Sequence, residues 1–523
     1  MGEQALFALA IAIAVVVIIA RAVATTLEVP EAVALVVLGV LASLIPQVPR
    51  IILAPNTVLL LFVPPLVYNA AFLSAPRESR ENAVPIIALA VGATTATIAG
   101  VGWVTVLLLP ALGWAAAIAF AAAVAPTDAV AATSVLRKLG APQRVVTILE
   151  GESLINDAVA LTAFGLAVEA MAHPFTIGHG LLRLAEVVLG GIAYGLVVGV
   201  VTGRIRRSVR DPVIQILISL ITPFLAYIPA DELQLSGVLA AVTAGAYLGT
   251  RADGMIPAAS RVAGNTVWQT LTFLLESTLF VLLGLELRSI AASLSDTHSM
   301  AWLAGGAAAI VAAVVVIRMA WELAVSPLLR FLPGGHSGFV RNPWRQRLVI
   351  GWGGMRGALT LAIALSLPTS RNGRPFAERS TLILLAGVVV MATLIGQGLT
   401  LAPLLRALGL TRGEQRQRLE ASARAKVTEA GLARLEALAE AGEVDEDTAS
   451  VYRQLLEMRL DRVREVLGDT DADRAIDITD FRRALLGAQR DKLAELYDNR
   501  KIDDEIRRSI SASLDRQEPG LQR

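Results

Sequence analysis

Long apolar runs separated by short polar segments occupy residues 1–410 of the chain. A helix crosses the hydrocarbon core of a bilayer with about 20 apolar residues, and we therefore predict membrane-spanning helices at thirteen places. Twelve or fourteen spans are the alternatives, because the second segment is short and the eighth and ninth almost touch. The thirteen segments are residues 4–26, 31–46, 52–73, 83–110, 114–137, 143–171, 181–203, 212–229, 233–249, 267–287, 300–325, 347–367 and 380–406.

Two of these segments carry helix-breaking residues near their centres. Pro126 removes a backbone donor from the fifth segment, and Thr127 and Asp128 can cap the half-helix that continues after it. In the twelfth segment, four glycines within residues 351–357 weaken the helix around Arg356. Irregular backbone at membrane depth is tolerated only beside protein or a wet cavity. The pattern favours two inverted halves, each with one interrupted helix, that cross at the midplane.

Polar side chains also interrupt the sixth apolar segment, ILEGESLINDAVALTAFGLAV. Their spacing of i, i+1, i+4 and i+5 places them on one face of a helix: Glu152, Ser153, Asn156 and Asp157. An ionisable side chain at the bilayer centre costs about 3 kcal/mol on insertion scales and marks a functional site by default. We therefore expect ion binding at this stripe.

Arg356 lies in the middle of its apolar segment and cannot lose its proton. It therefore requires a carboxylate as a partner, and the candidates are Asp128, Glu152, Asp157 and Glu276. We predict a structural ion pair between Glu152 and Arg356, which leaves Asp157 able to bind and release a proton.

Two further charges lie in apolar segments. Arg318 has Glu322 four residues further on, which is the spacing of an ion pair along one helix. Glu276 is interpreted as a buried structural charge that lines either an interface between subunits or a cavity.

The composition agrees with a protein whose solvent is lipid. Hydrophobic residues make up 55% of the chain, and the mean hydropathy is +0.62. A formal net charge of +1 gives no reason to expect a nucleic-acid partner. The absence of cysteine excludes disulfides, thiolate metal sites and a cysteine nucleophile. No phosphate-binding loop, HExxH or GxSxG motif occurs, so we expect no enzyme activity and no cofactor.

Charged residues concentrate after Leu410, where 46 of the 91 Asp, Glu, Lys and Arg residues are found. We therefore place a domain boundary there, with a transmembrane transporter domain in residues 1–409 and a cytoplasmic helical tail in residues 410–523. Leucine and valine recur in the tail at three- and four-residue spacing, which is typical of amphipathic helices. The tail is interpreted as a solvated appendage, with a regulatory or dimer-supporting role as the alternative.

Basic residues in the loops indicate the orientation of the chain. With the N-terminus outside, the inside loops contain fifteen Lys and Arg residues and the outside loops six. This difference favours an outside N-terminus, a cytoplasmic tail and an odd number of spans. The first segment has no basic region before it and no clear cleavage site, so we interpret it as a retained helix rather than a signal peptide. We expect a multi-pass protein of the cell (inner) membrane.

Several separate motifs resemble those of monovalent cation/proton antiporters, in particular the electroneutral sodium/proton exchanger branch. The similar segments occur in order over residues 1–410: PPLVYNAAF (64–72), PTDAV (126–130), EGESLINDAV (150–159), LQLSGVLAAVTAG (233–245) and GGMRGA (353–358). The resemblance implies an all-helical homodimer in which a mobile core domain moves against a scaffold domain. It also implies a role in pH homeostasis, with Na⁺ and H⁺ as the transported ions.

The resemblance also implies roles for individual residues. Asp157 corresponds to the aspartate that binds either the cation or protons, and Asn156 replaces the second aspartate of the electrogenic branch. The groups that line or ligate the monovalent cation are matched by Thr127, Asp128 and Ser153. A structural ion pair is matched by Glu152 and Arg356. In PPLVYNAAF, Asn69 stands where many relatives carry an acid, which leaves the role of that acid without a counterpart here.

These features predict exchange of a cation for a proton. A buried carboxylate favours its protonated form when empty and its charged form beside a cation, so the two ions compete for Asp157. Because Asn156 takes no proton, we expect one proton per cation. Selectivity for K⁺ or Li⁺ instead of Na⁺ is the nearest alternative, and a cation channel or a non-transporting membrane sensor are alternatives of another class. A channel needs a continuous polar stripe through several helices, and a sensor needs an output domain. Neither feature is recognisable in the sequence.

Overall fold

A computed structural model describes residues 3–27, 31–45, 54–73, 82–172, 177–294, 299–325, 343–371, 374–411, 413–467, 489, 491–493 and 495. The chain divides into two compact units, Met1–Gly413 and Glu414–Arg523. Each unit is described by itself.

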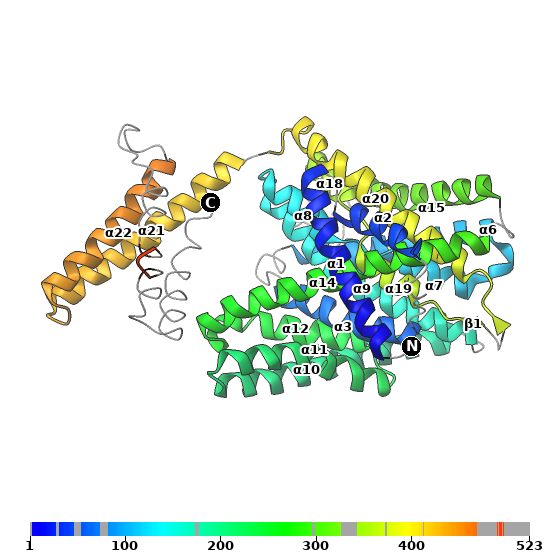
Figure 1. The fold of residues 1–523 in the computed structure, drawn as a ribbon, viewed down its shortest axis with the longest axis horizontal. Coiled ribbons are helices and arrows are strands. Elements are labelled where there is room, and N and C mark those ends of the chain that lie inside the picture. Colours follow the sequence, from blue (N-terminus) through cyan, green and yellow to red (C-terminus); the bar gives the residue numbers. More distant parts are fainter. Residues whose placement is uncertain are drawn as a thin grey trace. The chain divides into compact units, whose positions relative to one another are not determined.

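The larger unit is almost entirely helical (Figure 1). Its only described strands, β1 (Ser370–Arg371) and β2 (Arg374–Pro375), form a short antiparallel pair. The helices are α1 (Glu3–Leu27), α2 (Glu31–Ser43), α3 (Pro55–Leu73), α5 (Ala83–Ile87), η1 (Ala88–Ala93), α6 (Thr94–Leu108), η2 (Pro110–Leu112), α7 (Trp114–Val124), α8 (Ala129–Lys138), α9 (Gln143–Ala172), α10 (Ile177–Ser208), α11 (Pro212–Glu232), α12 (Gly237–Gly249), α13 (Ala252–Met255), α14 (Ala258–Leu294), α15 (Met300–Ala320), η3 (Trp321–Val325), α18 (Trp344–Trp352), α19 (Ala358–Leu365) and α20 (Arg379–Ala407).

The prediction of an all-helical membrane protein with two interrupted helices is confirmed. Each of the thirteen predicted segments coincides with helix, and two of them consist of paired half-helices, α7 with α8 and α18 with α19. Among the described helices, eight are long and apolar enough to cross a bilayer, and four shorter ones are also apolar. The eighth and ninth segments are separate helices, because Ser236 begins α12 by accepting a hydrogen bond from the Leu239 amide.

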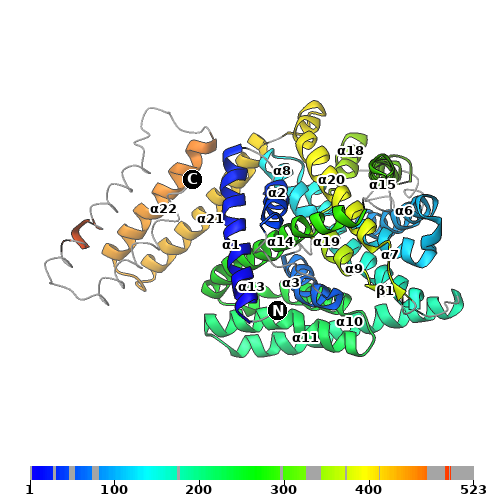
Figure 2. The same ribbon diagram turned by 45° about the vertical axis from the view of Figure 1, so that its right-hand side comes forward.

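The helices of the larger unit pack in two groups. The panel helices are α1, α2, α3, α10, α11, α12 and α14, and α10, α11 and α12 run alongside one another (Figures 1 and 2). The crossing helices are α6, α7, α8, α9, α15, α18, α19 and α20. Small residues allow the closest contacts. A Cβ atom on Gly39 of α2 would lie 2.7 Å from the Val281 carbonyl oxygen of α14, so these two backbones touch.

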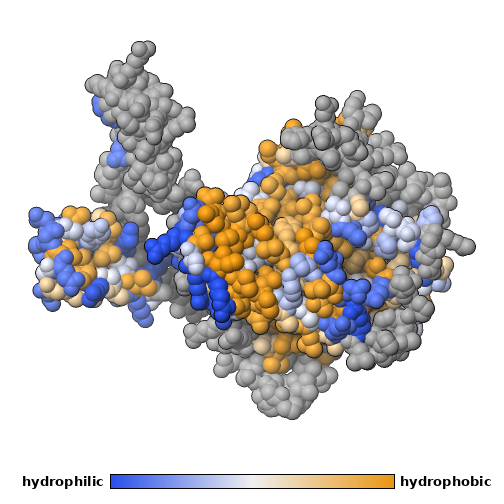
Figure 3. Space-filling model, turned by 90° about the horizontal axis from the view of Figure 1, so that it is seen from below, coloured by the Kyte–Doolittle hydropathy of each residue, from blue (hydrophilic) through white to orange (hydrophobic). Residues whose placement is uncertain are grey.

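Large apolar side chains cover much of the outside of this unit. Figure 3 shows them as a broad hydrophobic area with polar residues at its edges. Exposed members come from helices far apart in the sequence, among them Ile18, Leu107, Leu189 and Val213. A soluble monomer rarely exposes so large a continuous apolar surface, whereas helices in contact with lipid require one.

The smaller unit contains the amphipathic helices α21 (Gly413–Glu440) and α22 (Glu446–Leu467). Asp445 begins α22, because its Oδ1 accepts a hydrogen bond of 2.7 Å from the Thr448 amide and its Oδ2 one of 2.8 Å from the Thr448 hydroxyl. These bonds favour the charged carboxylate and hold the pKa of Asp445 below its usual value.

Candidate functional site

The two interrupted helices meet at their breaks. Residues 125–128 separate α7 from α8, and residues 353–357 separate α18 from α19. The Asp128 amide donates a hydrogen bond of 2.7 Å to the Met355 carbonyl, which joins the two breaks directly. The crossing that the proline and the glycines indicate is therefore present, and it places irregular backbone inside the protein, where its polar groups find partners.

Arg356 satisfies carbonyl groups that the break in α7 leaves open. Its Nε donates to the Val124 carbonyl at 3.1 Å, its Nη2 to the Ala125 carbonyl at 3.5 Å, and its Nη1 to the Gly354 carbonyl. The side chain is almost fully buried. A cation at the carbonyl end of a helix is favourable, because the peptide dipoles place partial negative charge there. Arg356 thus stabilises the end of α7.

The predicted ion pair between Glu152 and Arg356 is wrong. Glu152 pairs with Arg318, whose Nη1 donates to Oε1 and whose Nη2 donates to Oε2 at 2.7 Å. Arg318 reaches this position from α15, and its Nε also donates to the Gly351 carbonyl at 3.1 Å. The planar guanidinium of Arg318 donates two parallel hydrogen bonds to the Glu152 carboxylate. Arg356 instead donates its hydrogen bonds to carbonyl groups. The sequence analysis also expected Arg318 to pair with Glu322 of the same helix. The main ion pair of Arg318 is instead with Glu152 of α9.

Three predicted site residues form a hydrogen-bond chain around Thr127. Ser153 donates to the Thr127 carbonyl at 2.8 Å, and the Asn156 amide donates to the Thr127 hydroxyl at 2.7 Å. The Thr127 hydroxyl lies 3.3 Å from Glu152 Oε1 and donates to it. Asn156 is fully buried, and its Oδ1 accepts no hydrogen bond from the part of the chain that the structure describes. These hydrogen bonds hold the break after Pro126 against α9.

A cavity of about 490 Å³ lies beside the hydrogen bonds around Thr127, at the junction of the two groups of helices. It extends inward from partly exposed Arg137 and Glu150, which form an ion pair, to buried Thr127 and Thr360. Its mouth lies at the end of the protein that contains the turn between α8 and α9. The cavity therefore gives access to the broken helices from one end of the protein.

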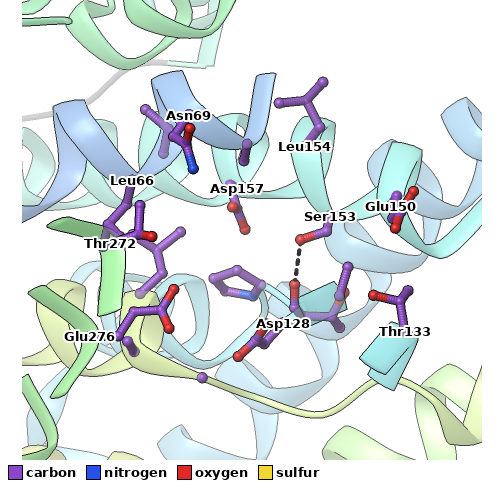
Figure 4. Close-up of a pocket in the computed structure, with 18 of the residues that line it drawn as sticks. Leu66, Asn69, Asp128, Thr133, Glu150, Ser153, Leu154, Asp157, Thr272 and Glu276 are labelled. Carbon is purple, nitrogen blue, oxygen red and sulfur yellow. Dashed lines mark hydrogen bonds between the residues drawn. The ribbon is translucent and has the colours of Figure 1, made fainter. Parts of the chain in front are cut away.

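Asp157 points into this cavity from α9 (Figure 4). Ser153 lines the same wall, and Asp128 lines it at the start of α8, where its Oδ1 accepts a hydrogen bond of 3.4 Å from the Ala131 amide. Across the described ranges, the Asp157 carboxylate has no hydrogen-bond or ion-pair partner. It is the carboxylate of the predicted stripe that remains open to a small ion, because Glu152 is held by Arg318.

The structure brings Thr127, Asp128, Ser153 and Asp157 together around the cavity, whereas Asn156, Glu152 and Arg356 lie behind its wall. It also adds two residues of the panel helices: Asn69 of α3 and Glu276 of α14. Figure 4 shows both extending toward the same space as Asp157. The sequence analysis placed Glu276 at either a subunit interface or a cavity, and in the structure Glu276 lines the cavity. A carboxylate among apolar residues was the only signal for it.

Comparisons with known proteins all identify sodium/hydrogen exchangers or antiporters as similar to this chain. Residues 11–407 match the family model described as sodium/hydrogen exchanger, transmembrane. The chain is 31% identical over 510 residues to an uncharacterised Na⁺/H⁺ exchanger of Mycobacterium tuberculosis, a match that covers 94% of this chain and 91% of the relative. It is 31% identical over 404 residues to the Na⁺/H⁺ antiporter NhaH of Halobacillus dabanensis, covering 74% of this chain and 94% of the relative.

A solved structure has the same fold. The sodium proton antiporter MjNhaP1 of Methanocaldococcus jannaschii superposes with a TM-score of 0.59 at 18% identity, and the match covers 77% of this chain and all of the solved one. The multi-pass helical body, the crossed breaks and the family match lead to one conclusion: this chain belongs to the transmembrane sodium/hydrogen exchanger family and is a cation/proton antiporter.

Proposed function

We propose that the protein exchanges Na⁺ for H⁺ across the cell membrane, one proton per cation, with both ions competing for Asp157. The observation that carries the proposal is the Asp157 carboxylate, which faces the cavity without a hydrogen-bond or ion-pair partner among the described residues. Sodium prefers oxygen ligands as a hard cation, and a proton neutralises the same charge. Binding of one ion therefore excludes the other.

Neighbouring oxygen atoms are positioned to complete the cation site. Ser153 and Thr127 line the cavity beside Asp157, and the Thr127 carbonyl has a second lone pair besides the one that accepts from Ser153. Asp128 adds a further carboxylate at the start of α8. Asn156 orients Thr127 through its amide and takes no proton itself. This arrangement supports a stoichiometry of one proton per cation.

Transport requires that Asp157 face each side of the membrane in turn. The site lies between the panel helices and the crossing helices, and the cavity opens at one end. We infer that the crossing helices move as the mobile core against the panel helices as the scaffold, so that the cavity closes at one end and opens at the other. The packing of Asp157, Asp128 and Ser153 on one group favours their movement together.

The remaining expectations complete the proposal. The distribution of basic loops favours an outside N-terminus and a cytoplasmic tail in residues 410–523 of an inner-membrane protein. The cavity mouth at Arg137 then faces the cytoplasm. We also propose a homodimer that contributes to pH homeostasis.

The decisive experiment compares the wild type with Asp157→Asn in everted membrane vesicles. A fluorescent pH indicator follows proton movement when Na⁺, K⁺ or Li⁺ is added across a range of pH. We expect Asp157→Asn to abolish the cation-driven signal with every ion, because asparagine keeps the shape of the side chain and removes the charge. Full residual exchange in this variant would disprove the role of Asp157.

Glu186→Gln provides the matched control. Glu186 is an exposed carboxylate on α10 that pairs with Arg183 of the same helix and is not part of the cavity lining. This variant removes one negative charge as well, and it should exchange cations at the wild-type rate. The order of responses to the three cations decides between Na⁺ and the K⁺ alternative, and a cation current without coupled proton movement would favour a cation channel.

A further inference from the structure

Glu276 is an ionisable side chain that the proposed exchange does not yet use. It lies on α14, one of the panel helices, within the long apolar segment FLLESTLFVLLGLEL. It lines the cavity opposite the wall that carries Asp157 (Figure 4). Among the residues that the structure describes, it has no hydrogen-bond or ion-pair partner. A carboxylate kept in such a place at the cost of its burial calls for a function.

The groups around Glu276 do not neutralise it. Its electrostatic neighbours are Asp128 and Glu31, both acids. Arg21 of α1 lies 3.7 Å from Glu31 and forms an ion pair with it. Asn69 is the polar residue that α3 contributes to the same cavity, and it is uncharged. Acidic side chains therefore outnumber basic ones along the cavity lining.

The basic residue of the cavity lining lies at the mouth and is already paired. Arg137 forms its ion pair with Glu150, and both side chains are partly exposed. A cleft lined by one sign of charge raises the local concentration of ions of the opposite sign. Within the described ranges, no three carboxylate or histidine side chains lie close enough to hold one metal ion together. Glu276 lies on the opposite side of the cavity from Asp157.

We propose that Glu276 is a one-sided cation-attracting residue: it binds the entering cation on the panel wall and delivers it to Asp157 from the end where the cavity opens. This inference rests on the proposed exchange at Asp157. Because Glu276 belongs to the panel helices and Asp157 to the crossing helices, movement of the core separates the two. Glu276 therefore acts on the cation that enters through this cavity and not on the one that enters from the other side.

The test is the apparent KM for Na⁺ measured separately from each side of the membrane, in vesicles of both orientations. The chain contains no cysteine, so a single Lys138→Cys substitution near the cavity mouth, labelled with a membrane-impermeant maleimide, identifies the vesicles that expose this end. We expect Glu276→Gln to raise the apparent KM about tenfold from the cavity side, with little change in the maximal rate. From the opposite side, the apparent KM should stay at the wild-type value.

Two further variants keep the test independent of folding defects. Asn69→Asp adds a carboxylate to the same wall and should lower the cavity-side KM in the wild-type background. Combined with Glu276→Gln, it should return the KM toward the wild-type value. Thr278→Val is the matched control on α14, because among the described residues the Thr278 hydroxyl donates to the Leu274 carbonyl of its own helix alone, at 2.7 Å. It should leave both KM values unchanged.

An equal change of KM from both sides, or no change in Glu276→Gln together with no effect of Asn69→Asp, would overturn the inference. Exchange lost in Asp157→Asn but unaltered in the Glu276 variant would remove Glu276 from the mechanism and leave the proposed function intact. Absence of cation-driven exchange in the wild type would instead contradict the proposed function.

Discussion

Glu152 and Asp157 lie on the same helix, yet their surroundings give them different tasks. Arg318 binds both oxygens of Glu152, and Thr127 donates to one of them. Asp157 faces the cavity without such donors among the described residues. A carboxylate that is fully paired has no reason to exchange protons during transport, whereas one that faces water and a cation does. Structural and transporting acids are thus separated by about one helical turn.

The pair of Glu152 and Arg318 leads to a prediction about stability. Either single reversal, Glu152→Arg or Arg318→Glu, leaves a buried charge without its partner and should cost about 3–5 kcal/mol. The double reversal should recover part of this loss. The measurement is the temperature at which the detergent-solubilised protein loses its monodisperse peak in size-exclusion chromatography.

Two controls define the outcome. Glu446→Gln breaks an exposed ion pair with Arg453 in the tail and should change stability by less than about 1 kcal/mol. The double reversal of Glu152 with Arg356 should recover nothing, because carbonyl groups bind Arg356. Recovery in this second pair instead of the first would contradict the assignment.

At the scale of elements, the crossing of the two broken helices depends on a close approach of their backbones. A Cβ atom on Gly357 would lie 2.2 Å from Asp128 Oδ2 and 2.7 Å from the Asp128 Cβ atom. Such distances are far below van der Waals contact. Glycine at 357 therefore allows the start of α19 to pack directly on the start of α8, where Asp128 faces the cavity.

Gly357→Ala should displace Asp128 and reduce cation-driven proton movement at least tenfold, while the protein still inserts into the membrane. The reason is local, because the added methyl group moves one wall of the cavity and leaves the other helices in place. Gly305→Ala serves as the control, since a Cβ atom built there meets no atom within 4 Å among the described residues, apart from the neighbouring backbone of its own helix. Wild-type exchange by Gly357→Ala in everted vesicles would show that the contact can relax without consequence.

The elements could be predicted from the sequence because each has a local cause. Apolar length predicts the helices, Pro126 predicts one break and the glycines around Arg356 predict the other. The partner of Glu152 could not be predicted in this way, because Arg318 and Arg356 are both buried arginines that need compensation. Which of them reaches α9 depends on how α15 and α18 pack in space. The place of Glu276 in the cavity depends in the same way on the packing of α14.

At the scale of the whole molecule, a stoichiometry of one proton per cation moves no net charge in a cycle. Exchange should therefore proceed at the same rate with or without an imposed membrane potential. Proteoliposomes that contain the purified protein, with a potential set by an ion gradient that the protein does not transport, provide the measurement. A clear acceleration by potential would show that more than one proton moves for each cation.

The one-sided cavity has an electrical consequence for this protein. The cavity reaches from its mouth to Asp157, so water that enters it brings the voltage of one aqueous phase to the site, and the transmembrane field then falls across the protein beyond the site. The free energy of one unbalanced elementary charge changes by about 2.3 kcal/mol for each 100 mV of potential when the charge crosses this part of the protein. Asp157 carries no net charge through this field when it holds a proton or one cation, so both forms that take part in exchange cross without this cost. The empty, deprotonated form alone would feel the potential, and it does not need to cross in a coupled exchange.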